Sequence, residues 1–395
     1  MGPLPRYPTG GTLDARPGPA RDDRRRSRGT RKLRLGVIGA GAWAVESHLP
    51  AFARHADVVE PSVLNRRDPV LLESIRRRFG FARATTRWQD VVAERPDIIV
   101  VSSPAALHHE QAAAALEVGA HVLVEKPFTL TSAEAWDLVG KAIRSRTELV
   151  VAYGWNYRPM VVEAERLMTT DGGIGEIEHL SITMSSNTRA LLSETQSANP
   201  SPGRPRPETW TDRAISGGGY GQAQLSHALG LALRLTGLRG AEVFAYMGGG
   251  SPGIELHDAI SVRYVGGAIG TLSGSSNHGA GGGKHQLEVR VIGTRGQLLL
   301  DLEREALWRY RGHGDDMRIP LEPDAGRYDA IGPVDAIVEL ALGRGENRSP
   351  AELGARTTEI LEAAYRSAAT HAAAAIEVDS PSLAGLASGQ AQPLE

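Results

Sequence analysis

The chain has 395 residues, of which 41% are hydrophobic and 23% are charged, with a formal net charge of −2 and no cysteine. This length fits about two or three domains of about 150 residues each, and the composition is typical of a globular protein with a full-sized core. The balanced charge excludes a general nucleic-acid binder, no apolar run reaches the roughly 18 residues that span a membrane, and the lack of cysteine excludes disulfides, thiolate metal sites and cysteine nucleophiles.

The first part of the chain predicts a tail followed by alternating strands and helices. Residues 1–31 are rich in Pro, Gly and Arg without apolar periodicity, so we predict a disordered tail. Over residues 32–153, short apolar runs alternate with stretches of helical periodicity. The expected strands cover 33–38, 58–64, 97–101, 121–124 and 149–153, and the expected helices run to about 54 and over 69–79, 105–118 and 133–145. This order predicts an α/β protein with an N-terminal Rossmann domain, a doubly wound parallel sheet that binds a dinucleotide.

The second part predicts consecutive strands. They are expected at 177–185, 241–248, 258–265, 268–275, 285–293 and 297–301, with helices at 222–233, 333–342 and 351–375 and a long polar loop over 187–213. Such a run indicates a C-terminal α/β domain over 154–377 with an open, mainly antiparallel sheet, for substrate binding and oligomerisation. Because an open sheet face often becomes a subunit contact, we expect a homo-oligomer. Residues 378–395 predict a second disordered tail.

A glycine-rich turn follows the first strand directly. Gly39-Ala40-Gly41-Ala42-Trp43-Ala44 matches G-x-G-x-x-G/A at the point where a strand leads into a helix. Gly39 permits the tight turn, Gly41 lets the backbone approach a pyrophosphate, and Ala44 is small enough for close helix–strand packing. The helix N-terminus then offers N–H groups to the phosphates. We therefore expect Gly39, Gly41, Ala42, Trp43 and Ala44 to bind a dinucleotide.

The end of the second strand predicts which dinucleotide binds. An acidic residue there would accept a hydrogen bond from the adenosine ribose, but the chain has Asn65, followed by Arg66 and Arg67. An arginine can hold a 2′-phosphate through two hydrogen bonds. The cofactor is therefore NAD(P)(H), with NADP(H) slightly favoured. The open alternatives are that both arginines are solvated surface groups, or that Asp68 takes the acidic role.

A charged pair follows the strand at 121–124. In Glu125-Lys126-Pro127 the lysine lies at the carboxyl end of a parallel strand, where ligands of such sheets bind. Pro127 fixes the backbone just after it and is able to hold a cis bond. The alternative is a surface ion pair of little consequence. We therefore expect Lys126 to point at the crevice where the nicotinamide lies.

Several motifs together resemble the Gfo/Idh/MocA oxidoreductases over about residues 33–376. They are Gly39–Ala44, Ser103-Pro104 with His108, Glu125-Lys126-Pro127, Ile174-Gly175-Glu176-Ile177, Gly217-Gly218-Gly219 with His227, and Ala364-Tyr365-Arg366-Ser367. The resemblance implies the two-domain fold and NAD(P)-dependent oxidation or reduction of sugars, polyols or their derivatives. It also implies cofactor contacts for Ser103, Pro104, His108 and Glu125, and contact of Lys126 with both nicotinamide and substrate.

The family pattern also implies a proton-transfer pair in the second part. It places an Asp one helical turn before His227, but this chain has Ala223 there, flanked by Gln222 and Gln224, which do not ionise. His227 is a suitable acid or base near neutral pH. We therefore predict Lys126 and His227 as the catalytic residues. The alternative is a helix histidine that serves packing alone.

Weaker substrate candidates follow the strand that joins the two expected domains. Tyr153, Asn156 and Arg158 are able to contact a polyhydroxylated substrate, or instead pack at a hinge; Gln224 is the fourth candidate besides Lys126 and His227. The histidines form no ligand set with carboxylates, so we expect no metal.

The predicted function is hydride transfer between a nicotinamide cofactor and a carbohydrate-like substrate, in the cytoplasm, without nucleic-acid or membrane partners. One alternative is a glycosidase or eliminase that oxidises its substrate transiently with bound NAD, for which the Asp-to-Ala departure leaves room. A second is a dinucleotide-binding regulator without turnover. Retention of Glu125, Lys126 and His227 weighs against the regulator.

Overall fold

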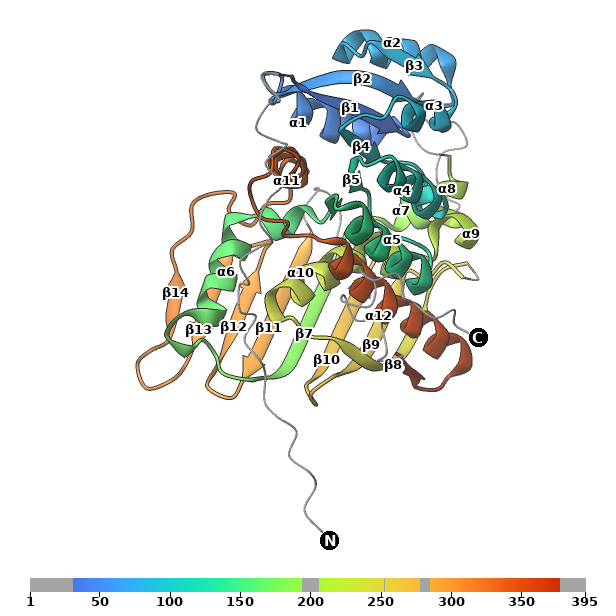
Figure 1. Ribbon diagram of the computed structural model, residues 1–395. Coiled ribbons are helices and arrows are strands. Elements are labelled where there is room, and N and C mark those ends of the chain that lie inside the picture. The colour runs from blue at the N-terminus through green and yellow to red at the C-terminus, as the bar shows by residue number, and fades with distance from the viewer. Residues whose placement is uncertain (1–30, 194–205, 252, 278–284, 377–395) are drawn as a thin grey trace. The chain divides into compact units, whose positions relative to one another are not determined.

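The computed structural model describes residues 31–193, 206–251, 253–277 and 285–376. Both predicted tails lie outside the described residues, apart from Arg31. Residues from Leu33 onward form one compact unit with two sheets, shown in Figure 1.

The first sheet contains six parallel strands in the order β3-β2-β1-β4-β5-β6. They are β1 (Leu33–Ile38), β2 (Val59–Asn65), β3 (Arg83–Thr85), β4 (Ile98–Val101), β5 (His121–Val124) and β6 (Leu149–Val151). This is the strand order of doubly wound dinucleotide-binding sheets, in which the direction of winding reverses between β1 and β4. The predicted fold class is confirmed for this sheet. The short strand β3 was not expected, and β6 ends two residues before the predicted limit.

Helices cover both faces of this sheet, and local signals set their ends. They are α1 (Leu49–Ala53), α2 (Pro69–Phe79), α3 (Trp88–Ala93), α4 (His108–Glu117) and α5 (Ser132–Ser145). The Asp68 carboxylate caps α2 by accepting from Val70 N and Leu71 N, both at 3.0 Å. Thr131 and Glu134 form a capping box at α5. Two predicted helices begin in other geometries: η2 (Ala44–His48) is a π-turn before α1, and η3 (Ala105–Leu107) is a 3₁₀ turn before α4.

The second sheet contains nine strands in the order β14-β13-β12-β11-β7-β10-β9-β8-β15. They are β7 (Ile177–Ser185), β8 (Gly240–Gly248), β9 (His257–Tyr264), β10 (Ile269–Ser275), β11 (Gln286–Gly293), β12 (Gly296–Asp301), β13 (Ala306–Tyr310), β14 (Met317–Ile319) and β15 (Ala374–Ala375). β7 and β10 pair in parallel, and the other pairs are antiparallel. Residues of β9 alternate between exposed and buried, so one face is covered and the other is open. The predicted open, mainly antiparallel sheet is confirmed.

Three longer helices pack against the covered face: α6 (Pro159–Thr169), α10 (Ser226–Thr236) and α12 (Ala351–Thr370). Helix α6 was not predicted. Helix α12 ends before the predicted residue 375 because His371 takes a left-handed conformation and β15 then pairs with β8. The predicted loop at 187–213 contains short helical segments where it is described, α7 (Arg189–Leu192), α8 (Glu208–Thr211) and the start of α9 (Arg213–Ser216).

Helix α11 (Ile331–Ala341) returns from the second sheet to the first. Its buried residues Val334, Ile337 and Val338 belong to the same core cluster as Leu35 and Val37 of β1. The chain after α11 also joins this sheet, because Val151 N donates to Ser349 O at 2.8 Å. The core around the parallel sheet is therefore built from both ends of the described chain.

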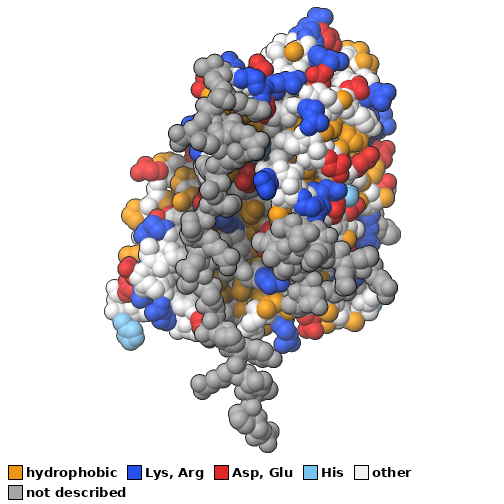
Figure 2. All heavy atoms as spheres, viewed as in Figure 1, with side chains coloured by type: hydrophobic (Ala, Val, Ile, Leu, Met, Phe, Trp, Pro, Cys, Tyr) orange, Lys and Arg blue, Asp and Glu red, His pale blue; other side chains and the backbone are white. Residues whose placement is uncertain are grey.

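The described surface mixes the two signs of charge. On the face shown in Figure 2, Lys and Arg side chains are interspersed with Asp and Glu. Within the described ranges, no helix has both the length and the apolar character needed to cross a membrane.

Candidate active site

The loop after β1 lies at the carboxyl edge of the parallel sheet and fits a dinucleotide. Gly39 has a φ of +80°, and a Cβ there would lie 2.7 Å from the Ser103 backbone nitrogen, so only glycine is accommodated. At Gly41 an added Cβ would meet only the Gly39 carbonyl oxygen, at 3.9 Å. The face of Gly41 is thus open for a phosphate group to approach the backbone.

The residues after β2 lie beside this loop. The side chain of Asn65 is buried and points inward, where it accepts from Gly39 N at 3.3 Å and donates to Thr85 O at 3.1 Å. Arg66 donates from Nη1 to Ala40 O at 2.5 Å, so its guanidinium lies against the dinucleotide loop. Arg67 is exposed, and Asp68 is occupied in capping α2. Of residues 65–68, the structure thus places the Arg66 cation beside the loop, and the only carboxylate among them, that of Asp68, caps α2.

His108 connects the loops after β4 and β5. Its Nε2 lies 2.8 Å from Ser103 O and its Nδ1 lies 2.9 Å from Pro127 O. Burial lowers the pKa of His108, while these carbonyl contacts oppose the shift. The Lys126–Pro127 peptide bond is cis. The two loops that carry the predicted cofactor residues are therefore held together by one buried imidazole.

Glu125 is the acceptor that fixes the dinucleotide loop to the end of β5. Its Oε1 accepts from Trp43 Nε1 and from His48 Nε2, both at 2.6 Å. Burial of the carboxyl group raises its pKa, but the hydrogen bonds from His48 and Trp43 and the charge of Lys126 outweigh this and lower it. His48 lies in the π-turn η2, and the sequence analysis did not identify it.

Lys126 lies against the second π-turn, η6 (Gly221–Leu225), which precedes α10. Its Nζ donates to the backbone oxygen of Ala223 at 2.8 Å. The carbonyl at position 223 thus accepts from the ammonium group at the place where the family pattern has a carboxylate. Both π-turns of the described residues lie at this site, consistent with the frequent occurrence of such turns at functional sites.

His227 is brought close to Lys126. Its side chain is only 6% exposed, and its Nδ1 is buried without a hydrogen-bond partner among the described residues. Burial and the charges of Lys126 and His285 lower its pKa well below the usual value. The imidazole is therefore neutral near pH 7 and able to accept a proton.

Aromatic rings surround His227. Trp155 and Tyr328 lie 5.4 and 5.3 Å from its ring centroid, and Tyr153 lies at 6.3 Å. Trp43 lies 6.3 Å from Tyr328 and is 42% exposed. The sequence analysis did not select Trp155 or Tyr328, since neither belongs to a motif.

The other predicted substrate residues differ in their surroundings. Asn156 is buried and donates to Ser349 Oγ at 3.1 Å, and Arg158 forms an ion pair with Asp329. Gln224 is partly exposed on η6. Tyr153 packs beside His227, while Asn156 and Arg158 have intramolecular partners. Their predicted contacts with substrate stay predictions.

The glycine-rich stretch at the start of η6 packs around a buried carboxyl group, Glu255, that sequence reasoning missed. Glu255 accepts from Gly219 N at 2.9 Å, Gly221 N at 2.8 Å and the Tyr365 hydroxyl at 2.7 Å. A Cβ at Gly218 would collide with the Tyr365 hydroxyl. The glycine turn is therefore shaped by Glu255 and Tyr365.

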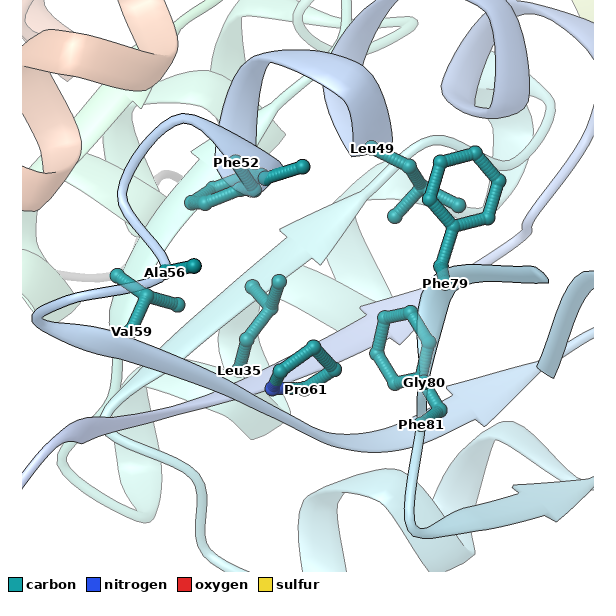
Figure 3. Close-up of a pocket in the computed structure, with 10 residues that line it drawn as sticks. Leu35, Leu49, Phe52, Ala56, Val59, Pro61, Phe79, Gly80 and Phe81 are labelled. Carbon is teal, nitrogen blue, oxygen red and sulfur yellow. The ribbon is translucent and has the colours of Figure 1, made fainter. Parts of the chain in front are cut away.

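An apolar pocket lies at the opposite edge of the parallel sheet (Figure 3). Its volume is about 250 Å³, and its walls come from the first residues of β1 and β2, from α1 and from the end of α2. The lining residues are Leu35, Leu49, Phe52, Ala53, Ala56, Val59, Pro61, Phe79, Gly80 and Phe81. It lacks the polar groups that orient a substrate, so we place the site at the carboxyl edge. Within the described ranges, no cluster of three or more metal-ligating side chains occurs.

Two family models match the chain. Residues 33–153 match the oxidoreductase family with an NAD-binding Rossmann fold, and residues 162–299 match the GFO/IDH/MocA C-terminal domain. The two matched ranges together make up more than half of the chain.

Known proteins with similar sequences include dehydrogenases. The chain is 26% identical over 306 residues to levoglucosan dehydrogenase of Pseudarthrobacter phenanthrenivorans, an overlap of 69% of this chain and 74% of that protein. It is 30% identical over 150 residues to D-glucoside 3-dehydrogenase of Escherichia coli, which is 37% of this chain and 41% of that protein. The chain therefore spans less than half of the second relative.

Solved structures share the fold. Levoglucosan dehydrogenase in complex with NADH and levoglucosan matches with a TM-score of 0.73 at 21% identity, covering 88% of this chain and 100% of that one. An aldose-aldose oxidoreductase from Caulobacter crescentus matches with a TM-score of 0.70 at 20% identity, covering 87% and 100%. At these identities the likeness extends to the architecture of both sheets.

Proposed function

Because this chain belongs to the Gfo/Idh/MocA family of oxidoreductases, we propose that it is an NAD(P)-dependent dehydrogenase or reductase acting on a CH–OH group of a sugar, cyclitol or sugar derivative. The observation that carries this proposal is the approach of the Lys126 ammonium to the turn before His227, at the carboxyl edge of the dinucleotide-binding sheet. The sugar class is supported by relatives named for levoglucosan and D-glucoside.

Lys126 and His227 divide the proton work. The neutral imidazole of His227 accepts the hydroxyl proton of the alcohol during oxidation and returns it during reduction. The Lys126 ammonium donates to the same substrate oxygen and stabilises the negative charge that develops on it. The lowered pKa of His227, which favours its neutral form, supports this division.

The cofactor supplies the redox chemistry: when bound, the nicotinamide accepts or delivers the hydride at the substrate carbon. Gly39, Gly41 and the start of η2 would hold the pyrophosphate, and Trp43 and Glu125 would border the nicotinamide end. These residues keep the reacting carbon oriented and the proton-transfer groups within reach of its oxygen.

Arg66 is the residue that we expect to favour NADP(H). Its guanidinium lies on the dinucleotide loop, and the carboxylate of Asp68, two residues further on, caps α2. Replacing Arg66 by Ala should weaken NADP(H) binding about tenfold, by loss of one charge-assisted contact, and leave NAD(H) binding nearly unchanged. Dissociation constants from titration calorimetry test this, with the exposed Arg77→Ala as a control. Tighter binding of NAD⁺ than NADP⁺ by the wild type would contradict the preference.

Turnover tests the proposed reaction. Levoglucosan, D-glucose, methyl β-D-glucoside and myo-inositol are offered with NAD⁺ and NADP⁺, and nicotinamide absorbance is followed. We expect net reduction of the cofactor with at least one compound, and a loss of about 10³-fold or more in kcat for Lys126→Met and His227→Gln. The control is Lys141→Met, because that lysine forms ion pairs with Glu117 and Asp137 away from the site.

Three outcomes decide against the proposal. Unchanged turnover in Lys126→Met would remove its assigned role. Product formation without net change in nicotinamide absorbance would favour elimination through transient oxidation, for which the alanine at position 223 leaves room. Cofactor binding with no turnover over a broad sugar panel would favour a regulator.

A further inference from the structure

The ring of Tyr328 occupies a central place in the candidate site, although it comes from the segment just before α11. Its centroid lies 5.3 Å from that of His227, 4.8 Å from Trp155 and 6.3 Å from Trp43. It therefore contacts the imidazole assigned to proton transfer and approaches the loop assigned to the cofactor. No predicted motif includes it.

The hydroxyl group of Tyr328 is available as a hydrogen-bond donor. Burial and the nearby carboxylates of Glu125 and Asp329 raise its pKa well above the usual value, so the phenol stays protonated. Within the part of the chain that the structure describes, its hydroxyl has no hydrogen-bond partner, and it is not among the fully buried unpaired groups. A donor beside an apolar ring suits a carbohydrate, which offers both C–H faces and oxygen acceptors.

The segment that carries Tyr328 is fixed by ionic and backbone contacts. Arg158 pairs with the Asp329 carboxylate and donates from Nη2 to Asp324 O at 2.6 Å. Glu305 accepts from the backbone N–H groups of Asp324 and Gly326, both at 3.0 Å. These contacts fix the loop both before and after Tyr328. The Tyr328 ring therefore lies at the site without any movement of the loop.

The interdomain turn after β6 leaves room for this segment. A Cβ at Gly154 would collide with the Asp329 backbone oxygen and lie 2.7 Å from Tyr328 Cε2. Gly154 and Arg158 both lie just after β6. This part of the chain therefore leaves room for the Tyr328 segment at Gly154 and holds the segment through the Arg158–Asp329 ion pair. Arg158 thereby holds the loop that carries Tyr328.

We infer that Tyr328 is a substrate-contacting residue, which packs its ring against the carbohydrate held between Lys126 and His227 and donates its hydroxyl proton in a hydrogen bond to a carbohydrate oxygen. Arg158 is a positioning residue that acts through Asp329. The inference rests on the proposed function and assigns a residue and a role that the sequence motifs do not contain.

Steady-state kinetics with the sugar that wild type turns over test the inference. Tyr328→Phe removes one neutral hydrogen bond and should raise KM for the sugar about three- to tenfold, with kcat changed less. Tyr328→Ala also removes the ring contact and should lower kcat/KM about 100-fold. The dissociation constant of the cofactor, measured by quenching of protein fluorescence, should stay within about twofold. Tyr246→Phe, on the open sheet face, is the matched control.

A double-mutant cycle separates positioning from general stability. Arg158→Met should raise KM for the sugar as Tyr328→Ala does, and Arg158→Lys should recover part of the loss. In the Tyr328→Ala background, Arg158→Met should add little, because the two residues act as one unit. Thermal melting of each variant shows that it is folded.

The outcomes separate this inference from the proposed function. The role of Tyr328 alone would be overturned if three results occur together. Tyr328→Phe keeps the wild-type KM, Tyr328→Ala keeps kcat/KM within threefold of wild type, and Lys126→Met abolishes turnover. Additive losses in the cycle would overturn the role of Arg158. If wild type turns over no sugar, or if Lys126→Met is fully active, the proposed function fails and this inference fails with it.

Discussion

The Lys126 ammonium and the His227 imidazole share a buried space in which only one of them is favoured as a cation. Burial lowers the pKa of both groups, but Glu125 supports the charge of Lys126, whereas Lys126 and His285 oppose a charge on His227. The surroundings therefore favour a positive charge on Lys126 over one on His227. Two groups whose environments separate their protonation states are a common basis for acid–base chemistry near neutral pH.

The lowered pKa of His227 predicts how stability depends on pH. The folded-state pKa lies below the unfolded value of about 6.5, so the unfolded chain binds the proton first and stability falls as pH drops through and below 6.5. Replacing His227 by Asn should remove roughly 1 kcal/mol of the stability lost between pH 7.5 and 5.5. Denaturant unfolding at the two pH values measures this difference.

The same substitution at an exposed position controls for the prediction. His257 is exposed on the open face of the second sheet, so His257→Asn is the matched control for the substitution itself. His108 is also buried with a lowered pKa, so part of the acid sensitivity remains in the His227 variant. An equal loss of stability between pH 7.5 and 5.5 in wild type and His227→Asn would show that the imidazole is not held neutral.

At the scale of elements, the two π-turns contact two adjacent residues, Glu125 and Lys126, which follow β5. His48 of turn η2 and Trp43 just before it donate to Glu125, and the Ala223 carbonyl of turn η6 accepts from Lys126. The geometry of η6 depends on the buried Glu255 and its donors. Burial raises the pKa of Glu255 despite its three donors, and it raises that of its neighbour Asp258, whose carboxylate oxygens have no hydrogen-bond partner among the described residues.

Tyr365 therefore holds the element that carries His227. Its hydroxyl donates to Glu255 and accepts from Gln222 N at 3.3 Å. Tyr365→Phe should lower the free energy of unfolding by about 1–3 kcal/mol, since a buried carboxyl group loses a donor, and should reduce kcat about tenfold by displacing the turn. Urea unfolding and kinetics measure the two effects.

A variant of the same turn tests the coupling from the other side. Gly218→Ala places a methyl group against both the hydroxyl and the ring of Tyr365, and should be tolerated better together with Tyr365→Ala, which removes both, than alone. Full activity of Tyr365→Phe, with only a loss of stability, would show that the turn keeps its geometry without this hydrogen bond.

The sequence predicted elements whose signal is local. The run Ile98–Val101 is buried on both faces and is continuously apolar, so β4 could be predicted, and the glycines at 39 and 41 identified the loop by position. The short strand β3 carried no comparable signal. Helix α6 carries one that the sequence analysis did not use, Pro159 at its first position followed by buried residues at helical spacing. Glu255, Tyr328 and His48 owe their roles to partners far along the chain, and no spacing in a single sequence encodes those contacts.

At the scale of the molecule, α11 carries the chain from the second sheet back into the core of the parallel sheet. Its residues Val334, Ile337 and Val338 complete the core of the parallel sheet, and His55 in the loop after α1 pairs with Asp335 at 2.7 Å. The segment that carries Tyr328 leads directly into this helix. Loss of α11 packing should therefore disturb the parallel sheet and the candidate site together.

Replacing Ile337 by Ala tests this coupling. The cavity left in the core should lower the free energy of unfolding by about 2–4 kcal/mol, whereas the exposed Leu342→Ala should change it by less than about 0.5 kcal/mol. Because α11 completes one core cluster of the parallel sheet, and a second core cluster contains residues of both sheets, calorimetry should show one transition that moves as a whole to lower temperature. Near-ultraviolet circular dichroism and cofactor binding should be lost at the same midpoint. Two separate transitions, of which only one responds to Ile337→Ala, would show that the sheets unfold independently and that α11 does not couple them.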